Sequence, residues 1–175
     1  MAYPLSMQSY SRTIVSIMAK KYAMGINHSL IDIPVGPTAK VPDMKTARWL
    51  KKKYEYVGKK LGMKVHVELT SALEPIGAGV GAVLQVREVL RVLQQHPKRP
   101  GDLEKKALYL ASKIIELVGM AKGKDALKLA YGQLISGKAW AMMQKIISAQ
   151  HGEPNVVSEK LPLAKIQRDV IAEKS

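Results

Sequence analysis

The sequence predicts an α/β fold with a few-stranded sheet, a βαβ unit and a C-terminal helical half. Two short β-branched runs lie on either side of a helical segment, which is the order of a βαβ unit. Three further helical segments follow residue 101, each ended by a glycine. With 175 residues, 47% of them hydrophobic, the chain is long enough to bury one sizeable core.

The first predicted elements are a helix over residues 5–24 and a strand over residues 28–34. Ile14 and Met18 recur at helical spacing, and Gly25 is a plausible helix stop. The run SLIDIPV is apolar and β-branched enough for a buried strand. The VGPT sequence that follows cannot continue the strand, so we expect a tight turn there.

A second helix and strand are predicted over residues 42–61 and 63–69. Pro42 suits a first helical turn, apolar residues recur at helical spacing, and Gly62 ends the segment. MKVHVEL then alternates like a half-buried strand. Two strands that flank a helix favour a βαβ unit, with a right-handed crossover if the strands are parallel.

The remaining chain is predicted to be mainly helical. Residues 96–102, HPKRPGD, break the chain, and Asp102 is a good candidate for a helix N-cap. Residues 153–175 alternate polar and scattered apolar side chains, which indicates an extended tail. The predicted helices span residues 82–95, 102–119, 123–136 and 138–150. The predicted segments are a helical segment 1–24, an α/β core with its helical half 25–152, and the tail 153–175.

Composition bounds the possible functions. The chain has no cysteine, which excludes disulfides, thiol catalysis and thiolate metal sites and is compatible with the cytoplasm. No apolar run is long enough for a membrane span, and no secretory signal pattern begins the chain. The four histidines fall in different elements without helical pairing, so a zinc site is not expected. A Ser16–His28–Asp32 triad has no GxSxG motif to support it.

The chain is strongly basic, and its charge is unevenly distributed. It has 28 Lys and Arg against 14 Asp and Glu, a formal net charge of +14. Residues 1–64 carry 12 of the basic side chains and only 3 of the acidic ones. A basic surface concentrates phosphates and nucleotides and also binds nucleic acid through phosphate neutralisation. The simpler interpretation is a solvated, lysine-rich surface.

Ser16 and Lys20 are the strongest candidate site residues. They are four positions apart in the first predicted helix, so the hydroxyl and the ammonium share one face. An ammonium so placed can stabilise negative charge that develops during a reaction. Further along, the loop SALEPIGAGVGA has three glycines that let the backbone approach another group closely. The loop lies between a strand and a helix, so a phosphate-cradling role is physically possible, although GAGVG is not a dinucleotide-binding loop.

Several strings resemble the thymidine phosphorylase and AMP phosphorylase family, especially its archaeal and type 2 bacterial branch, and they occur in the family's order. The resemblance runs from about residue 3 to residue 175. These strings are YPLSM, SIMAKK, IDIPVGPTAKV, EPIGAGVGAVLQVREVLRVL, DLEKKALYLA, SGKAW and ISAQHG. The resemblance implies a fragment of the nucleoside phosphorylase α/β domain, from the central region of a pentosyltransferase.

The resemblance also implies an activity and particular site residues. Phosphate is the expected co-substrate, and a nucleoside or nucleotide is split into free base and a sugar phosphate without a redox cofactor. Ser16 and Lys20 would bind the base, with Gly36 to Lys40 shaping the turn beyond the strand. Ile76, Gly79 and Glu88 would hold a monovalent cation, through two carbonyls and a carboxylate. That loop departs from the family, because Gln85 stands where a second Glu is usual.

The resemblance leaves parts of the family's catalytic apparatus without a counterpart. The Gly/Ser-rich phosphate-binding loop and an acid or histidine precede this region in the family. We therefore expect this chain to be inactive, or nearly so, on its own. A homo-oligomer is a further expectation from the family, and a cytoplasmic location is expected because the chain has no cysteine.

Two other classes of function remain open. The first is a basic, non-enzymatic module that binds nucleic acid without sequence preference. It explains the net charge, but only 5% of the residues are aromatic and none is Phe, so the usual stacking platform is missing. The second is an oligomerising scaffold, supported by the apolar face that the first helix would expose. A steep salt dependence favours the first, and a concentration-dependent mass favours the second.

Overall fold

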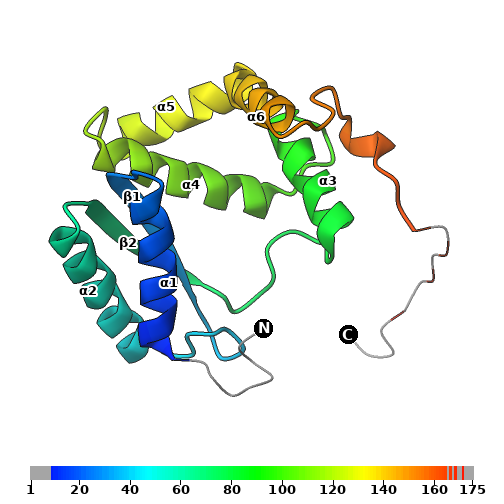
Figure 1. Ribbon diagram of the computed structural model, residues 1–175. Coiled ribbons are helices and arrows are strands. Elements are labelled where there is room, and N and C mark those ends of the chain that lie inside the picture. The colour runs from blue at the N-terminus through cyan, green and yellow to red at the C-terminus, as the bar shows by residue number, and fades with distance from the viewer. Residues whose placement is uncertain (1–8, 165, 167, 169–170, 172–175) are drawn as a thin grey trace. The chain divides into compact units, whose positions relative to one another are not determined.

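The structure is a computed structural model that describes residues 9–164, 166, 168 and 171 (Figure 1). The predicted α/β class with a C-terminal helical half is confirmed. The first residues of the predicted 5–24 helix and the YPLSM string lie outside the described residues. The elements in the described part are α1 (Tyr10–Ala23), β1 (His28–Val35), α2 (Met44–Lys60), β2 (Lys64–Ser71), α3 (Ala82–Leu93), α4 (Gly101–Leu117), α5 (Gly123–Ile135), α6 (Lys138–Ala149) and the 3-10 helix η2 (Ser158–Lys160).

Tertiary contacts group the chain into two compact units. The first, here called the sheet unit, comprises residues 1–76 and 105–132. The second, here called the helical unit, comprises residues 77–104 and 133–175. The predicted boundaries at residues 24/25 and 152/153 stay a prediction.

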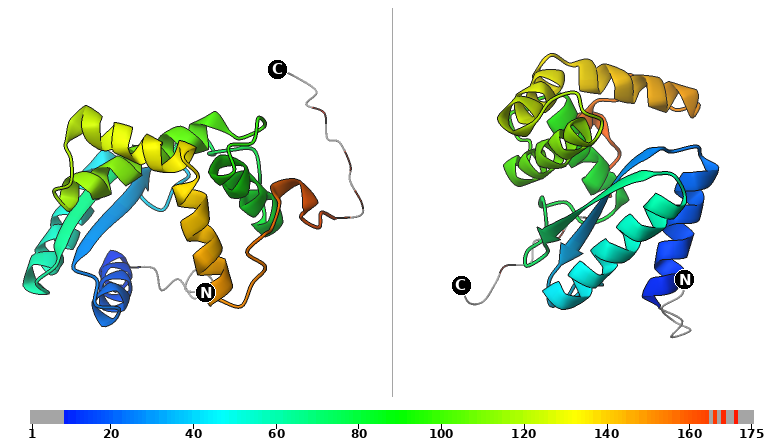
Figure 2. Two further views of the ribbon diagram at one scale, coloured as in Figure 1. Left: turned by 90° about the horizontal axis from the view of Figure 1, so that it is seen from above. Right: turned by 90° about the vertical axis from the view of Figure 1, so that its left-hand side faces the viewer.

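The sheet unit is built on a parallel pair of strands. β1 pairs with β2 in a register that runs from His28 opposite Lys64 to Val35 opposite Ser71. Helix α2 joins the two strands, so the predicted βαβ unit is confirmed. One face of this pair carries Ile31, Ile33 and Val67, which are buried against α1 and α2. Figure 2 shows these two helices on the same side of the strands.

Local capping explains where the first two helices begin. The Ser9 hydroxyl accepts a hydrogen bond from the Arg12 amide at 3.2 Å and caps α1. The Asp43 carboxylate accepts hydrogen bonds from the Thr46 amide and hydroxyl, both at 2.8 Å, and caps α2. These two hydrogen bonds lower the pKa of Asp43. The placement of Pro42 in the first helical turn was wrong, because Pro42 precedes the cap.

The opposite face of the two strands is polar and contacts α4. It carries Leu30, Asp32, His66, Glu68 and Thr70, which alternate with the core residues. The part of α4 that belongs to the sheet unit reaches this face through Lys106 and Tyr109. The strand pair therefore separates an apolar core from a polar layer.

In the helical unit, the segment after α6 packs on α3. The Arg91 guanidinium donates two hydrogen bonds to the Glu159 carboxylate, at 2.6 and 3.0 Å. The Gln94 side-chain amide donates to the Val156 carbonyl at 2.8 Å and accepts from the Ser158 amide at 3.3 Å. The described part of the predicted 153–175 tail thus includes η2, while residues 165, 167, 169–170 and 172–175 lie outside the described residues.

The N-cap prediction for Asp102 was wrong. Helix α4 begins at Gly101, which places Asp102 within the first turn. Its carboxylate accepts a hydrogen bond from the Gly77 amide at 2.7 Å, inside the helical unit. None of the helices in the described part of the chain has the length and apolar character of a membrane span.

Candidate functional site

Helix α1 presents Ser16 and Lys20 on its exposed surface. The opposite side of the helix buries Ile14 and Met18 in the core, which fixes the rotation of α1. Both Ser16 and Lys20 are exposed. Within the described residues neither side chain has a hydrogen bond or ion pair, so both are available to a ligand.

A pocket of about 700 Å³ lies beside this face of α1, inside the sheet unit. Its lining is mainly apolar and includes the hydroxyl-bearing residues Ser9, Tyr10 and Thr13, which suits a flat, partly polar ligand. Ser16 and Lys20 are not among the described lining residues. They continue the lining row of α1, because Ser16 lies two turns beyond Ser9 and Lys20 two turns beyond Thr13. The lining residues are Ser9, Tyr10, Thr13, Ile17, Ile31, Asp32, Ile33, Pro34, Ala39, Lys40, Val41, Leu50 and Tyr54.

The predicted turn after β1 forms one wall of this pocket. The Gly36 amide donates to the Val41 carbonyl at 3.2 Å, and the Ala39 amide donates to the Gly36 carbonyl at 2.9 Å. Gly36 also lies close to the chain after β2, where a Cβ would collide with the carbonyl oxygen of Ala72. The Tyr10 hydroxyl donates to the Lys40 carbonyl at 3.3 Å. The turn is therefore held by α1 through the Tyr10 hydroxyl and by the backbone of the chain after β2.

Glu88, the predicted carboxylate ligand of a cation, is buried at 8% exposure in the helical unit. Its Oε1 accepts a hydrogen bond from the Ala78 amide at 2.9 Å. A Cβ on Gly79 would lie 2.9 Å from the Leu84 carbonyl group, and because backbone cannot rotate aside, glycine is required for the loop to pass this closely. Glu88 thus orders the glycine loop in this structure.

The cation itself stays a prediction. Ile76 is the last residue of the sheet unit and its side chain is exposed, whereas Gly79 and Glu88 belong to the helical unit. Among the described residues, no three His, Cys, Asp or Glu side chains gather as a metal site. A site made largely of carbonyl oxygens does not require such a group, and hard oxygen ligands of this kind suit a cation.

A polar cluster on the strand face beside α4 was missed by sequence reasoning. Lys106 Nζ lies 3.0 Å from Asp32 Oδ2 and donates to the Thr70 hydroxyl at 3.0 Å. The Thr70 hydroxyl in turn donates to Asp32 Oδ1 at 2.7 Å. Asp32 is therefore engaged with β2 and α4. His28 Nδ1 is hydrogen-bonded to Oδ1 of its neighbour Asn27 at 2.8 Å. The Ser16–His28–Asp32 triad is not assembled within the described residues.

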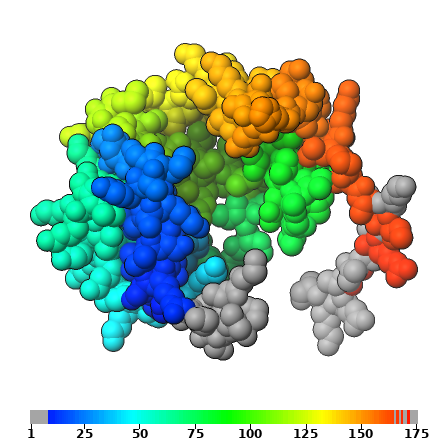
Figure 3. All heavy atoms as spheres, in the orientation of Figure 1, coloured from blue at the N-terminus to red at the C-terminus, as the bar shows by residue number. Residues whose placement is uncertain are grey.

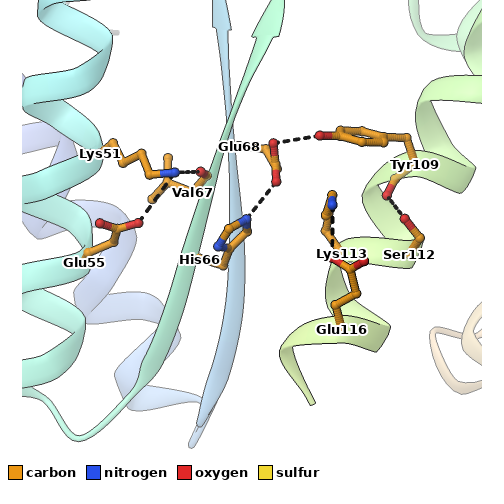
Figure 4. Close-up of polar contacts among 9 residues, drawn as sticks. All are labelled: Lys51, Glu55, His66, Val67, Glu68, Tyr109, Ser112, Lys113 and Glu116. Carbon is orange, nitrogen blue, oxygen red and sulfur yellow. Dashed lines mark hydrogen bonds and ion pairs between the residues drawn. The ribbon is translucent and has the colours of Figure 1, made fainter. Parts of the chain in front are cut away.

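The second half of the cluster is centred on Glu68 (Figure 4). His66 Nε2 lies 2.7 Å from Glu68 Oε1, and the Tyr109 hydroxyl donates to Glu68 Oε2 at 2.9 Å. Partial burial opposes ionisation of Glu68, but the hydrogen bonds from His66 and Tyr109 outweigh it and lower its pKa. The same carboxylate raises the pKa of Tyr109. The available sequence signal was a polar residue at every second position of β2.

Replacing Glu68 by glutamine is expected to reduce the loss of stability in acid. Because the folded-state pKa of Glu68 lies below its ordinary value of 4.5, its carboxylate stabilises the fold above about pH 4.5. That contribution is lost as the pH falls through the lowered pKa. Urea unfolding at pH 6 and pH 3 should show a smaller drop in unfolding free energy for Glu68→Gln than for the wild type.

Glu74→Gln is the control for this prediction. Glu74 is exposed, and within the described residues its side chain makes no ion pair or hydrogen bond. Its variant should show the same drop between pH 6 and pH 3 as the wild type. A drop for Glu68→Gln as large as that of the wild type would contradict a stabilising role for the Glu68 carboxylate.

The chain is similar to proteins named as phosphorylases. Curated relatives 40–44% identical over most of the chain are named thymidine phosphorylase, provisionally, or AMP phosphorylase. The resemblance expected from the sequence strings is thereby confirmed. No protein-family model matches the chain.

Three relatives show the extent of the match. A protein of Methylococcus capsulatus, provisionally named thymidine phosphorylase, is 44% identical over 147 residues, which are 84% of this chain and 28% of that protein. A protein of Albidiferax ferrireducens with the same provisional name is 41% identical over 151 residues, 86% of this chain and 29% of that protein. The AMP phosphorylase of Thermococcus kodakarensis is 43% identical over 159 residues, 91% of this chain and 31% of that protein. The chain spans about 30% of the length of these relatives.

Proposed function

We propose that this chain is a segment of a nucleoside or nucleotide phosphorylase, a pentosyltransferase. The observation that carries the proposal is the 41–44% identity with proteins named thymidine or AMP phosphorylase over 84–91% of the chain. Support from the structure is the pocket beside α1, with a hydroxyl and an ammonium continuing its lining row. Thymidine, uridine and AMP are the candidate substrates, and phosphate is the co-substrate.

In the proposed reaction a phosphate oxygen attacks C1′ of the sugar and the bond from C1′ to the base nitrogen breaks. The base leaves with the electron pair of that bond and is then protonated, and the other product is the sugar 1-phosphate. From AMP, which already carries a 5′-phosphate, that product would be the bisphosphate. Lys20 would stabilise the negative charge that develops on the leaving base, and Ser16 would hydrogen-bond the same base.

Other parts of the chain would act indirectly in this proposal. The turn from Gly36 to Lys40 would shape the wall of the pocket. Ile76, Gly79 and Glu88 would hold a monovalent cation, with the Glu88 carboxylate supplying its charge. The reaction needs no redox cofactor. We also propose a homo-oligomer located in the cytoplasm, where nucleotides are abundant. A chain without cysteine forms no disulfides, which is compatible with that reducing compartment.

The test is phosphate-dependent release of free base from thymidine, uridine and AMP. Two proteins are compared: the 175-residue chain, and a chimaera in which this chain replaces the homologous segment of the Thermococcus kodakarensis AMP phosphorylase. We expect release by the chimaera and none by the 175 residues alone, because they match only 31% of the length of the AMP phosphorylase. The parent AMP phosphorylase and a reaction without phosphate are the controls.

Each contrary outcome has a distinct meaning. Base release by the 175-residue chain would refute its expected inactivity. A chimaera that folds, judged by circular dichroism and a cooperative thermal transition, yet releases no base from any substrate would count against the phosphorylase assignment.

A further inference from the structure

The outer face of α2 is a dense, exposed array of cations. Seven of the 28 Lys and Arg residues fall within this helix, and six of those seven side chains are exposed. The six, here called the α2 basic face, are Lys45, Arg48, Lys52, Lys53, Lys59 and Lys60. Figure 3 shows α2, in cyan to turquoise, open to solvent along its length. The opposite side of α2 is buried in the core, which fixes the rotation of the helix about its axis and keeps these charges facing solvent.

Ion pairs in the described part of the chain do not involve the charges on this face. Within the described residues, none of the six forms an ion pair with a carboxylate. The one acidic residue inside α2 is Glu55, and it lies 3.8 Å from Lys51. Lys51 is the seventh cation and is engaged with the fold, since it donates to the Val67 carbonyl at 2.8 Å. The α2 basic face therefore presents six exposed cations, none of them in a carboxylate ion pair within the described residues, to an anionic partner.

Two exposed aromatic rings lie among these cations. Trp49 is 43% exposed and Tyr56 is 60% exposed. They are seven residues apart, so they share one side of the helix and lie about 10.5 Å apart along its axis. Lys53 lies 5.6 Å from the Trp49 ring centroid, and Lys60 lies 5.7 Å from that of Tyr56. A hollow of about 400 Å³ beside Tyr56 is lined by Tyr56, Lys59 and Lys60.

We propose that the α2 basic face binds single-stranded nucleic acid without sequence preference. The cations would neutralise successive backbone phosphates, while Trp49 and Tyr56 stack unpaired bases. The low aromatic content of the whole chain argued against such a platform, but the structure places two of its nine aromatic residues on the exposed side of the most basic helix. Trp49 adjoins the pocket beside α1, because its ring centroid lies 6.3 Å from that of the pocket residue Tyr10. Binding of nucleic acid at the α2 basic face goes beyond the proposed phosphorylase function.

The chemistry of the face favours this partner over the two obvious alternatives. Duplex DNA pairs its bases internally, so it would use the cations but leave the rings without stacking partners. An anionic membrane requires an apolar helix face that sinks into the lipid. The apolar side of α2 is instead buried in the core through Ala47, Leu50 and Tyr54.

The test is fluorescence anisotropy of a labelled twelve-nucleotide oligo(dT) with the full 175-residue chain, at several salt concentrations. Lys52→Gln/Lys59→Gln should weaken binding at least fivefold and flatten the dependence of log affinity on log salt. Tyr56→Leu should weaken binding about tenfold, as expected for one lost stacking contact. The control variants are Lys124→Gln/Lys145→Gln, which removes the same charge elsewhere, and Tyr131→Leu, an exposed tyrosine of α5.

Equal losses in the control variants would overturn the proposal, because binding would then follow net charge rather than the α2 basic face. An unchanged affinity for Tyr56→Leu would overturn it as well, since the rings would play no part. Tighter binding to a duplex of the same length, or to vesicles rich in phosphatidylserine, would replace the proposed partner with that one. Circular dichroism melts would establish that each variant is folded.

Discussion

Replacing Lys20 by methionine is expected to lower kcat/KM for phosphorolysis about a hundredfold in the chimaeric enzyme. Removing one group that stabilises developing negative charge typically costs a factor of about 100 to 1,000. Lys20 is exposed, and within the described residues it has no partner, so its loss should leave the fold intact. Methionine keeps the unbranched apolar stem and removes only the ammonium. Initial rates of base release at varied substrate concentration give the measurement.

Lys21→Met is the matched control. It removes the same charge one residue along the helix, and one residue corresponds to a rotation of about 100° around the axis. We expect its kcat/KM to stay within about threefold of the parent chimaera, since only general electrostatic attraction changes. A comparable loss in both variants would show that net charge, and not the position of Lys20, supports the reaction.

Replacing Gly36 by alanine is expected to lower the free energy of unfolding by about 2 kcal/mol, within the usual range for overpacking. The new Cβ would meet the carbonyl carbon of Ala72 at 2.7 Å and collide with its oxygen. Both contacts are with backbone, which cannot rotate aside as a flexible side chain can. Relief requires the turn after β1 to move from the chain after β2. Urea unfolding should show a lower midpoint with an unchanged slope.

Gly132→Ala is the control for this steric argument. Gly132 lies inside α5. Apart from its two chain neighbours and the nearby backbone of its own helix, a Cβ built there would have no heavy atom within 4 Å. Alanine also has the higher helix propensity, so this variant should be stabilised by about 0.5–1 kcal/mol. A Gly36→Ala protein as stable as the wild type would show that the turn has room to move, and the pocket wall would then be less firmly held.

Local sequence patterns were sufficient for most of the elements. Periodicity and glycine stops located the six helices and two strands of the described chain to within a few residues. Errors fell at helix starts, where capping competes with tertiary contacts. Asp102 was expected to cap α4, but its carboxylate accepts a hydrogen bond from the Gly77 amide. Such a partner, 25 positions away, leaves no mark on the local pattern.

The sequence by itself determined the α/β class, the shared face of Ser16 and Lys20, and the resemblance to the phosphorylases. Each depends on spacing within a few residues or on strings of residues in order. Only the tertiary structure decided which polar residues meet. Asp32 and Thr70 are 38 positions apart, and their contact depends on the parallel register of β1 and β2. Lys106 contacts Asp32, and Tyr109 contacts Glu68, because α4 packs on the polar strand face. The hydrophobic periodicity of a helix or a strand shows which of its faces is buried, but not which distant element packs against it.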